Sequence, residues 1–110
     1  MADLDLLQGT LDVLVLKTLA WGPRHGYAVA RWIKETSGGN IAVEDRALYV
    51  CLHRLEERGL ISAEWGVSEN NRKAKYYELT AKGRRALNSK AAEFTQYATA
   101  VFKILRAAEA

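Results

Sequence analysis

Residues 68–80, which read SENNRKAKYYELT, carry a local excess of positive charge. Three cations, Arg72, Lys73 and Lys75, fall within four residues, and residues 72–85 hold six basic side chains against one acidic side chain. Like charges this close repel one another unless a polyanion neutralises them, as DNA phosphates do with release of condensed counterions. Cations at the tip of a hairpin can also serve only to prevent aggregation through its edges. The cluster therefore indicates either an anion-binding surface or a solvated turn.

The overall composition sets broader limits. The chain has 110 residues, a net charge of +3 and 49% hydrophobic residues, which predicts one folded domain with one core. The N-terminus lacks a basic segment followed by a long apolar run, so no signal peptide is expected. No apolar run approaches the roughly 18 residues of a membrane span, so we expect a cytoplasmic protein.

Residues suited to catalysis or metal binding are few. The single cysteine, Cys51, excludes an internal disulfide and a multi-cysteine metal site. Cys51 and His53 are two residues apart on a predicted helix, so their side chains diverge, and His25 beside Gly26 suits a turn. The sequence has no paired carboxylates, phosphate-binding loop or zinc spacing. We therefore expect neither an enzyme nor a bound cofactor.

Three helices are predicted before the charged cluster, over residues 5–22, 25–39 and 44–59. The first is apolar on nearly every side, which places it at the centre of the core or against a partner. Pro23 separates it from the second helix, because proline disrupts helical hydrogen bonding. Glycine and asparagine at 38–40 end the second helix, because both tolerate the left-handed conformation of a helix stop.

Helical spacing also indicates which side chains face the core. In the second helix, apolar residues recur at this spacing at Tyr27, Ala30 and Ile33. The inward-facing residues of the third helix are Leu48, Cys51, Leu52 and Leu55. The apolar run 41–43 between these two helices could form a short strand.

A change of period follows the third helix. Four apolar residues alternate with polar ones, at Ile61, Ala63, Trp65 and Val67. This alternation predicts a half-buried strand. A second strand over 72–79 places Lys73, Lys75 and Tyr77 on one face. Asparagines at 70–71 suit the tip of the hairpin, because asparagine accepts a positive φ.

This order of elements predicts a mainly α fold with a small β-hairpin, a winged helix-turn-helix followed by a long helix. In that arrangement the third helix lies in the DNA major groove and the hairpin touches the backbone or the minor groove. At 100° per residue, Arg46, Val50 and His53 face outward, and Tyr49 and Arg54 lie on opposite flanks. The predicted DNA-binding residues are Arg46, Tyr49, Val50, His53, Arg54, Arg72, Lys73 and Lys75. Each of them, taken singly, could instead be a solvated surface residue.

The last helix is predicted to begin near Thr80, a suitable N-cap, and to run to about Arg106. Its apolar residues are spaced 4, 3, 4, 3, which keeps one narrow stripe facing a neighbouring helix. The predicted dimerisation residues are Leu87, Ala91, Phe94, Ala98, Val101 and Leu105. A helix of about 27 residues spans about 40 Å and must overhang a core of this size, so we expect a homodimer. The alternative is a helix that folds back along its own domain.

Three stretches together resemble the PadR family of bacterial transcriptional regulators over residues 4 to about 88. They are LLQGTLDVLVLKTLAWGPRHGYAVARWI, ALYVCLHRLEERGLISAEWG and RKAKYYELTAKGRRAL. The short last helix resembles the subgroup with a compact C-terminal dimerisation region. We expect a winged helix-turn-helix DNA-binding domain (1–80) and a C-terminal dimerisation helix (81–110), which together form one compact unit. The chain departs from the family's usual Gly-Ser-Leu-Tyr-Pro pattern, because it reads Arg-Ala-Leu-Tyr-Val at 46–50.

The resemblance implies a homodimeric repressor that binds double-stranded DNA at a two-fold-symmetric operator. It also implies release by a small, often aromatic, effector. Large aromatic residues are core by default, but some could line a cavity between subunits. They are Trp21, Trp32, Trp65 and Tyr97. A winged helix can also bind protein instead of DNA, and this alternative stays open.

Overall fold

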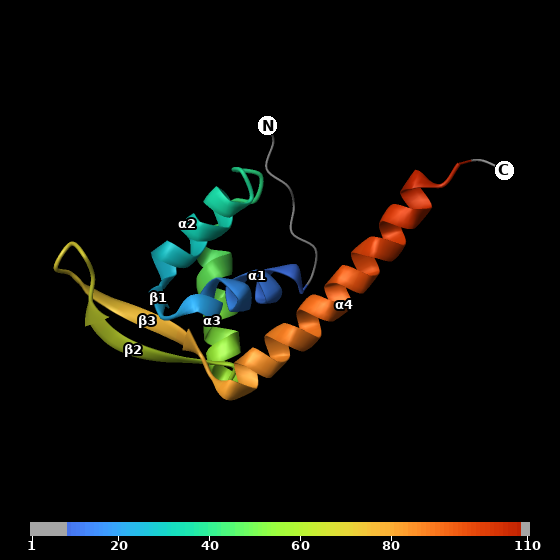
Figure 1. The fold of residues 1–110 in the computed structure, drawn as a ribbon. Helices are drawn as coiled ribbons and strands as arrows, with labels where there is room; N and C mark the ends of the chain where they lie inside the picture. Colours follow the sequence, from blue (N-terminus) through green and yellow to red (C-terminus); the bar gives the residue numbers. More distant parts are fainter. Residues whose placement is uncertain (1–8, 109–110) are drawn as a thin grey trace.

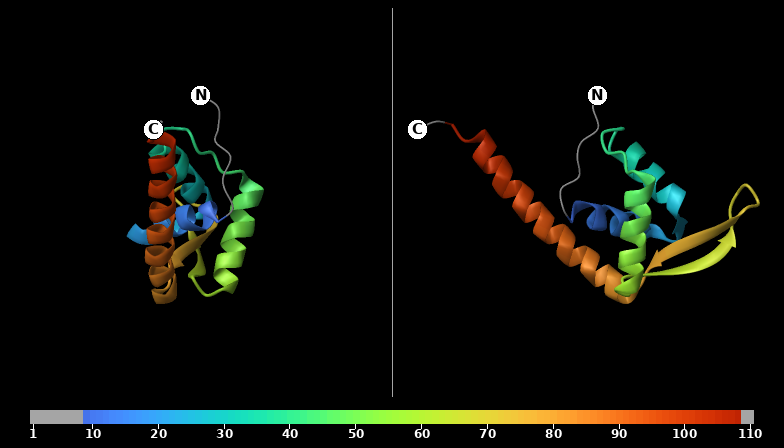
Figure 2. Two further views of the ribbon diagram at one scale, coloured as in Figure 1. Left: turned by 90° about the vertical axis from the view of Figure 1, so that its right-hand side faces the viewer. Right: turned by 180° about the vertical axis from the view of Figure 1, so that it is seen from behind.

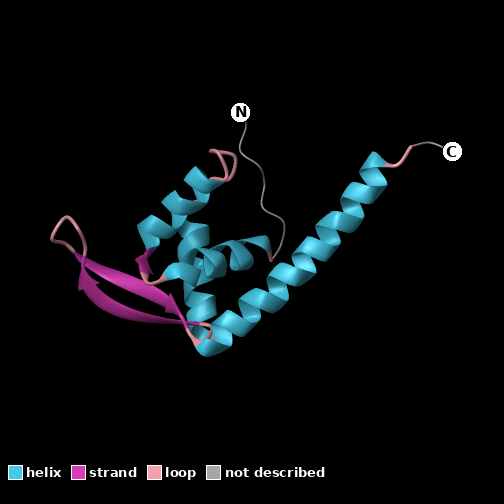
Figure 3. Cartoon of the chain, in the orientation of Figure 1, coloured by secondary structure: helices cyan, strands magenta, loops and turns pink. Residues whose placement is uncertain are grey.

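A computed structural model describes residues 9–108 and contains four helices, one turn of 3-10 helix and a three-stranded antiparallel sheet (Figures 1 and 3). The elements in chain order are α1 (Thr10–Thr18), η1 (Leu19–Trp21), β1 (Arg24–His25), α2 (Gly26–Thr36), α3 (Asp45–Glu57), β2 (Ile61–Val67), β3 (Lys73–Leu79) and α4 (Ala81–Arg106). The predicted mainly α fold with a winged helix-turn-helix is confirmed. Within residues 9–108, no helix combines the length and hydropathy needed to cross a membrane.

Helix α1 lies at the centre of the molecule, as its apolar composition predicts. It packs against α2, α3 and α4, and Val15 and Leu16 are completely buried. Thr18 is also buried, and its hydroxyl donates to the carbonyl oxygen of Leu14 at 2.7 Å. The part of the predicted first helix at 5–8 lies outside the described residues.

Helices α2 and α3 form the helix-turn-helix, and local hydrogen bonds define their ends. The backbone N–H of Ala28 donates to Nδ1 of His25 at 3.2 Å and so caps the start of α2. Gly38 and Gly39 both adopt positive φ angles at the predicted stop. The buried residues of α3 are Leu48, Cys51, Leu52 and Leu55, as predicted.

Two predictions for this region are wrong. Helix α2 buries Gly26, Val29 and Ile33, whereas Tyr27 is 67% exposed. Near its start, α2 has two faces with helical spacing, one that contains Tyr27 and one that contains Gly26. The face with Gly26 is buried because it packs against α3. Residues 41–43 form no strand. The short strand of this region is instead β1, only two residues long and therefore invisible to pattern analysis.

The sheet has the order β1-β3-β2, and the hairpin of β2 and β3 projects away from the helices (Figure 2). Ile61 pairs with Leu79 at the base, and Val67 pairs with Lys73 at the tip. Asn71 adopts a φ of 60° in the turn, as expected of an asparagine tip. At the base, Ile61 and Tyr77 are buried. Further out, Trp65 and Val67 are 61% and 66% exposed, because the projecting hairpin leaves nothing to cover them.

Helix α4 begins at a close junction with the hairpin and the end of α3. The hydroxyl of Thr80 accepts from the N–H of Gly83 at 3.0 Å, which confirms the predicted N-cap, and it donates to the carbonyl of Gly59 at 2.7 Å. The N–H of Thr80 donates to the carbonyl of Leu60 at 3.1 Å. A Cβ on Gly83 would lie 1.8 Å from that carbonyl oxygen, so only glycine fits here.

The rest of α4 leaves the core. Leu87 is 6% exposed and belongs to the core, so the first turns of α4 pack with the preceding domain. Further along, α4 extends away from the other helices, and the molecule measures 61 × 33 × 22 Å (Figure 1). The large apolar residues exposed there are Phe94, Tyr97, Phe102, Ile104 and Leu105. The predicted overhang is confirmed, and the domain division at 80/81 stays a prediction.

Candidate nucleic-acid interface

The outer face of α3 presents a row of exposed side chains opposite its buried stripe. Arg46, Val50 and His53 are all exposed and lie about one turn apart, as the spacing predicts. The Nε2 atom of His53 lies 2.8 Å from Oε1 of Glu57, one turn further along. The row therefore offers a guanidinium near the start of the helix and a histidine–carboxylate pair near its end.

Tyr49 lies on the flank of α3 that faces the wing, which we define as β2, β3 and the turn between them. The tyrosine packs against Gly26 at the start of α2, where an added Cβ would meet its hydroxyl oxygen at 2.9 Å. A groove of about 450 Å³ separates this flank from the wing. The side chains that line it are those of His25, Tyr27, Tyr49, Trp65, Lys73, Lys75 and Tyr77. Most of the side chains in the groove are thus aromatic, and two lysines add ammonium groups.

Each lysine of this groove is held over an aromatic ring. The Nζ atom of Lys73 lies 4.9 Å from the ring centroid of Trp65, and that of Lys75 lies 5.7 Å from the ring centroid of Tyr77. Lys75 Nζ also lies 3.4 Å from Oε1 of Glu56 on α3. Such cation–π contacts leave the ammonium charge intact while restricting its position. Two of the predicted wing cations therefore face α3.

Arg72 lies at the end of the turn and does not line the groove. Its side chain is exposed, and its backbone N–H donates to the Ser68 hydroxyl at 3.3 Å.

Arg54 lies on the opposite flank of α3 and has a different environment. Its guanidinium forms an ion pair with the carboxylate of Asp12 of α1, a residue that is 6% exposed. The Cys51 thiol donates to Asp12 Oδ1 at 3.2 Å. Burial, and then the hydrogen bond to Asp12, raise the pKa of Cys51 from 9.0 to about 12. The structure thus brings Arg54 to α1 and away from the wing.

Four aromatic residues of the groove were not among the predicted site residues, and one of them is Tyr77 of β3. His25 and Tyr27 come from the start of α2, and Trp65 comes from β2. The alternation along β2 predicted a half-buried face for Trp65, and the register with β3 places this face beside the wing lysines. The groove position of His25 and Tyr27 had no signal in the sequence, because it depends on how α2 meets the wing.

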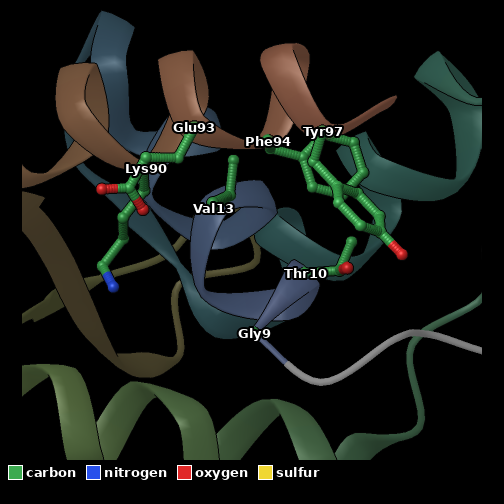
Figure 4. A pocket seen from close by; sticks show the side chains of 7 residues that line it. All are labelled: Gly9, Thr10, Val13, Lys90, Glu93, Phe94 and Tyr97. Atoms are coloured by element: carbon green, nitrogen blue, oxygen red, sulfur yellow. The ribbon is translucent and has the colours of Figure 1, made fainter. Parts of the chain in front are cut away.

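The predicted dimerisation residues divide into two groups. Leu87 is part of the core, and Ala91, Ala98 and Val101 are half-buried. Phe94 and Leu105 are 40% and 73% exposed. The exposed part of α4 runs beside α1, and a pocket of about 410 Å³ opens between the two helices (Figure 4).

Figure 4 shows Phe94 and Tyr97 of α4 on one side of this pocket, with Thr10 and Val13 of α1 facing them. Lys90 and Glu93 close the end nearer the core. Tyr97 is 60% exposed, so in the single chain it lines this pocket and does not follow the default assignment of large aromatic residues to the core.

Trp21 and Trp32 form a second aromatic pair away from the groove. Their ring centroids lie 5.6 Å apart, with Lys17 over Trp21 and Arg24 over Trp32. Trp21 is 63% exposed, which corrects the default assignment of this residue to the core.

Comparisons with known proteins agree with this geometry. A family model described as the transcriptional regulator PadR-like family matches residues 15–89, more than half of the chain. The crystal structure of a PadR family transcriptional regulator from Eggerthella lenta DSM 2243 is 34% identical with a TM-score of 0.73, and the match covers 92% of this chain and 86% of that one.

Two further solved structures show the same fold at lower identity. A transcriptional regulator from Clostridium thermocellum is 24% identical with a TM-score of 0.81, over 90% of this chain and 93% of that chain. Bacillus subtilis PadR in complex with operator DNA is 24% identical with a TM-score of 0.66. That match covers 76% of this chain and 47% of the Bacillus protein.

Proposed function

The chain belongs to the PadR-like family of transcriptional regulators, and we propose on this basis that it binds double-stranded DNA in a sequence-dependent manner. The observation that carries the proposal is the surface formed by the outer row of α3 and the cationic, aromatic groove beside it. In a winged helix-turn-helix this surface is the one that meets DNA. Bacillus subtilis PadR, which shares the fold, has been solved with operator DNA.

The parts of this surface have separable roles. Arg46 stands at the first turn of α3, where a guanidinium can donate two hydrogen bonds to a guanine edge in the major groove. Tyr49 can donate its hydroxyl to a phosphate, and Val50 and His53 lie along the same face. Arg72 and Lys73 neutralise phosphates, and Lys75 does so in competition with its contact to Glu56, so their contribution depends on salt and not on base sequence. Arg54 is excluded from this set because its charge is paired with Asp12.

We further propose that the protein acts as a homodimer through the exposed stripe of α4, on a two-fold-symmetric operator. Support comes from the large apolar side chains that the single chain leaves uncovered, among them Ile104 at 76% exposed. Exposed apolar surface of this kind marks a protein interface. A dimer presents two reading helices and two wings to one duplex. The family resemblance favours repression as the outcome of binding.

Selection of bound DNA from a pool of random duplexes tests the proposal directly. We expect a two-fold-symmetric consensus, and loss of binding as salt rises, with a slope of about 0.9 for each phosphate neutralised. A protein-interaction module, the alternative function, would retain no duplex at low ionic strength. Recovery of no enriched sequence would show that the protein does not read bases.

Two variants separate phosphate contacts from base contacts. Arg72→Ala combined with Lys73→Ala should weaken binding to all duplexes alike and lower the salt slope by about 2. Arg46→Ala should change the selected consensus. Lys103→Ala combined with Arg106→Ala removes the same charge at the far end of α4 and serves as the matched control. Unchanged affinity in the wing variant would contradict the role of the wing.

Release by a small aromatic effector is the remaining part of the proposal. The pocket of Figure 4 supports it, because Phe94 and Tyr97 offer aromatic surface next to the proposed dimer stripe. Tyr97→Ala should abolish the effect of an aromatic ligand on DNA affinity, measured at protein concentrations at which both the variant and the wild type are dimers. An equal ligand effect in the wild type and the variant would exclude this pocket.

A further inference from the structure

Helix α3 is held by polar contacts on both of its flanks. On one flank, Arg54 and Cys51 contact Asp12 of α1. On the other, Glu56 contacts Lys75 of β3 with 3.4 Å between Oε1 and Nζ. Arg54 and Glu56 are two positions apart, which corresponds to about 200° around the helix. The two polar contacts therefore lie on opposite sides of α3.

Both contacts are partly withdrawn from water, which makes them stronger than fully exposed pairs. The Asp12 side chain is 9% exposed, and that of Arg54 is 41% exposed. Those of Lys75 and Glu56 are 38% and 35% exposed. A nearly buried carboxylate without its guanidinium is strongly unfavourable, so α1 favours the rotation of α3 that presents Arg54.

The apolar stripe of α3 does not by itself fix this rotation closely. Burial of leucine side chains is favourable in proportion to area and has no directional requirement. A rotation of about 20° would move side-chain tips that lie roughly 5–6 Å from the helix axis by about 2 Å. That displacement exceeds the range of about 0.5 Å over which a hydrogen bond to a base edge keeps its length. Directional contacts are therefore needed for reading bases.

We infer that Asp12 and Glu56 are positioning residues, which set the rotation of α3 about its axis and thereby the alignment of Arg46 and His53 with base pairs. The inference rests on the proposed DNA binding. It assigns to Glu56 a second effect, because the carboxylate competes with phosphate for Lys75. Removal of Glu56 should strengthen binding to any duplex and weaken the preference for one sequence.

The measurement is the ratio of dissociation constants for a scrambled duplex and for the duplex selected by the wild-type protein, each corrected for the active fraction by stoichiometric titration. For Glu56→Gln we expect this ratio to fall about tenfold, comparable to losing the readout of one base pair. The salt slope on the scrambled duplex should rise in magnitude by up to about 0.9 as Lys75 becomes free to meet a phosphate.

Glu64→Gln is the matched control. Glu64 is exposed on β2 and pairs with Tyr76, so it points to the face of the wing away from Trp65 and Lys75. The substitution changes the net charge by the same amount but lies on β2, outside the contact between α3 and β3. We expect Glu64→Gln to change the affinity for both duplexes by one factor, which leaves their ratio unchanged.

Asp12→Asn tests the contact on the other flank of α3, and for this variant the unfolding temperature is measured together with the ratio of dissociation constants. The amide oxygen of asparagine can still accept from Cys51, whereas the charge that holds Arg54 is lost. We expect a lower unfolding temperature and, for the folded fraction, a ratio reduced by about tenfold or more. If Asp12→Asn fails to fold, Glu56→Gln, whose pair is more exposed, decides the question.

The outcomes separate the inference from the proposal beneath it. A wild-type protein that binds DNA, with both variants keeping the wild-type ratio, would overturn the positioning role and leave DNA binding intact. Equal losses of affinity on both duplexes would show that Asp12 and Glu56 affect binding without affecting the alignment of α3 with base pairs, which also overturns it. A wild-type protein that ignores duplex DNA would remove the proposed function and the inference together.

Discussion

Helices α3 and α4 each carry a regular apolar stripe, and the chain covers one stripe but not the other. The stripe of α3, Leu48 to Leu55, is at most 1% exposed. The stripe of α4 is buried at Leu87 but 40% exposed at Phe94 and 73% exposed at Leu105. The two patterns look alike in sequence, because periodicity specifies the direction of a face and not what covers it. Position decides the difference: α3 packs against α1, α2 and β2, whereas α4 extends past the core.

The largest expected difference between the two helices comes from one matched substitution. Leu52→Ala, at 0% exposure, should lower the free energy of unfolding by about 2–5 kcal/mol, because the transfer term and the cavity add. Leu105→Ala should change it by less than about 0.5 kcal/mol at protein concentrations where no dimer forms. Urea denaturation measures both. Similar costs at the two sites would show that the single chain also covers the end of α4.

A charge placed on the open stripe tests whether a second chain covers it. Leu105→Glu should raise the dimer dissociation constant on the order of 100-fold, because a carboxylate would lose its hydration in an apolar interface. Sedimentation equilibrium gives the constant, and far-ultraviolet circular dichroism should show unchanged helix content. Gln96→Glu adds the same charge about 180° from the stripe and should leave the dimer intact. A wild-type protein that sediments as a monomer would end the dimer proposal.

The covered end of α4 is expected to be sensitive to a single methyl group. Gly83→Ala should destabilise the protein by about 1–3 kcal/mol, because the Cβ would collide with the Leu60 carbonyl. Helix propensity alone predicts the opposite sign, a gain of about 1 kcal/mol. Ser89→Ala, two turns further along, measures that propensity without the collision. Thermal unfolding of the two variants should therefore shift in opposite directions.

A further expected difference concerns the buried stripe of α3 and appears only at high pH. The pKa of Cys51 is raised from 9.0 to about 12 by burial and by its hydrogen bond to Asp12, so the folded protein keeps the thiol neutral. Its stabilising contribution is present below pH 9 and is lost as pH rises towards 12. Urea midpoints measured across this range should fall more steeply for the wild type than for Cys51→Ala. If the urea midpoints of the two proteins fall in parallel with pH, the thiol of Cys51 is not shielded from water in the folded protein. Tyr77, whose pKa is also raised by burial, is present in both proteins and cancels in the comparison.

The sequence predicted the elements well wherever a periodic pattern was long enough to read. The four helices, the hairpin and the cap at Thr80 all agree with the structure, because each depends on neighbouring residues. Strand β1 was missed because two residues carry no period, and its existence depends on pairing with β3. Tyr27 and Trp65 were assigned to apolar faces, and the structure leaves both exposed beside the groove.

The candidate site was predictable in its charges but not in its contacts. Arg46, Val50 and His53 share an exposed face because a helix has a fixed turn per residue. The partner of Arg54 could not be predicted, because Asp12 is 42 residues away in the chain. The contact between Lys75 and Glu56 likewise depends on how the wing folds back towards α3. Long-range polar partners of this kind have no local pattern.

The junction at Thr80 has a consequence for the DNA that two copies could share. Its hydrogen bonds to Gly59 and Leu60, with Lys82 Nζ donating to the carbonyl of Arg58 at 3.0 Å, join the end of α3 to the start of α4 without a flexible linker. In the proposed dimer, the rigid connection between α3 and α4 then fixes the distance between the two α3 helices, and with it the separation of the two DNA half-sites. One inserted base pair would turn a half-site by about 35° and shift it by about 3.4 Å. A rigid connection cannot follow that change, so the dimer should bind operators with only one spacing between the half-sites.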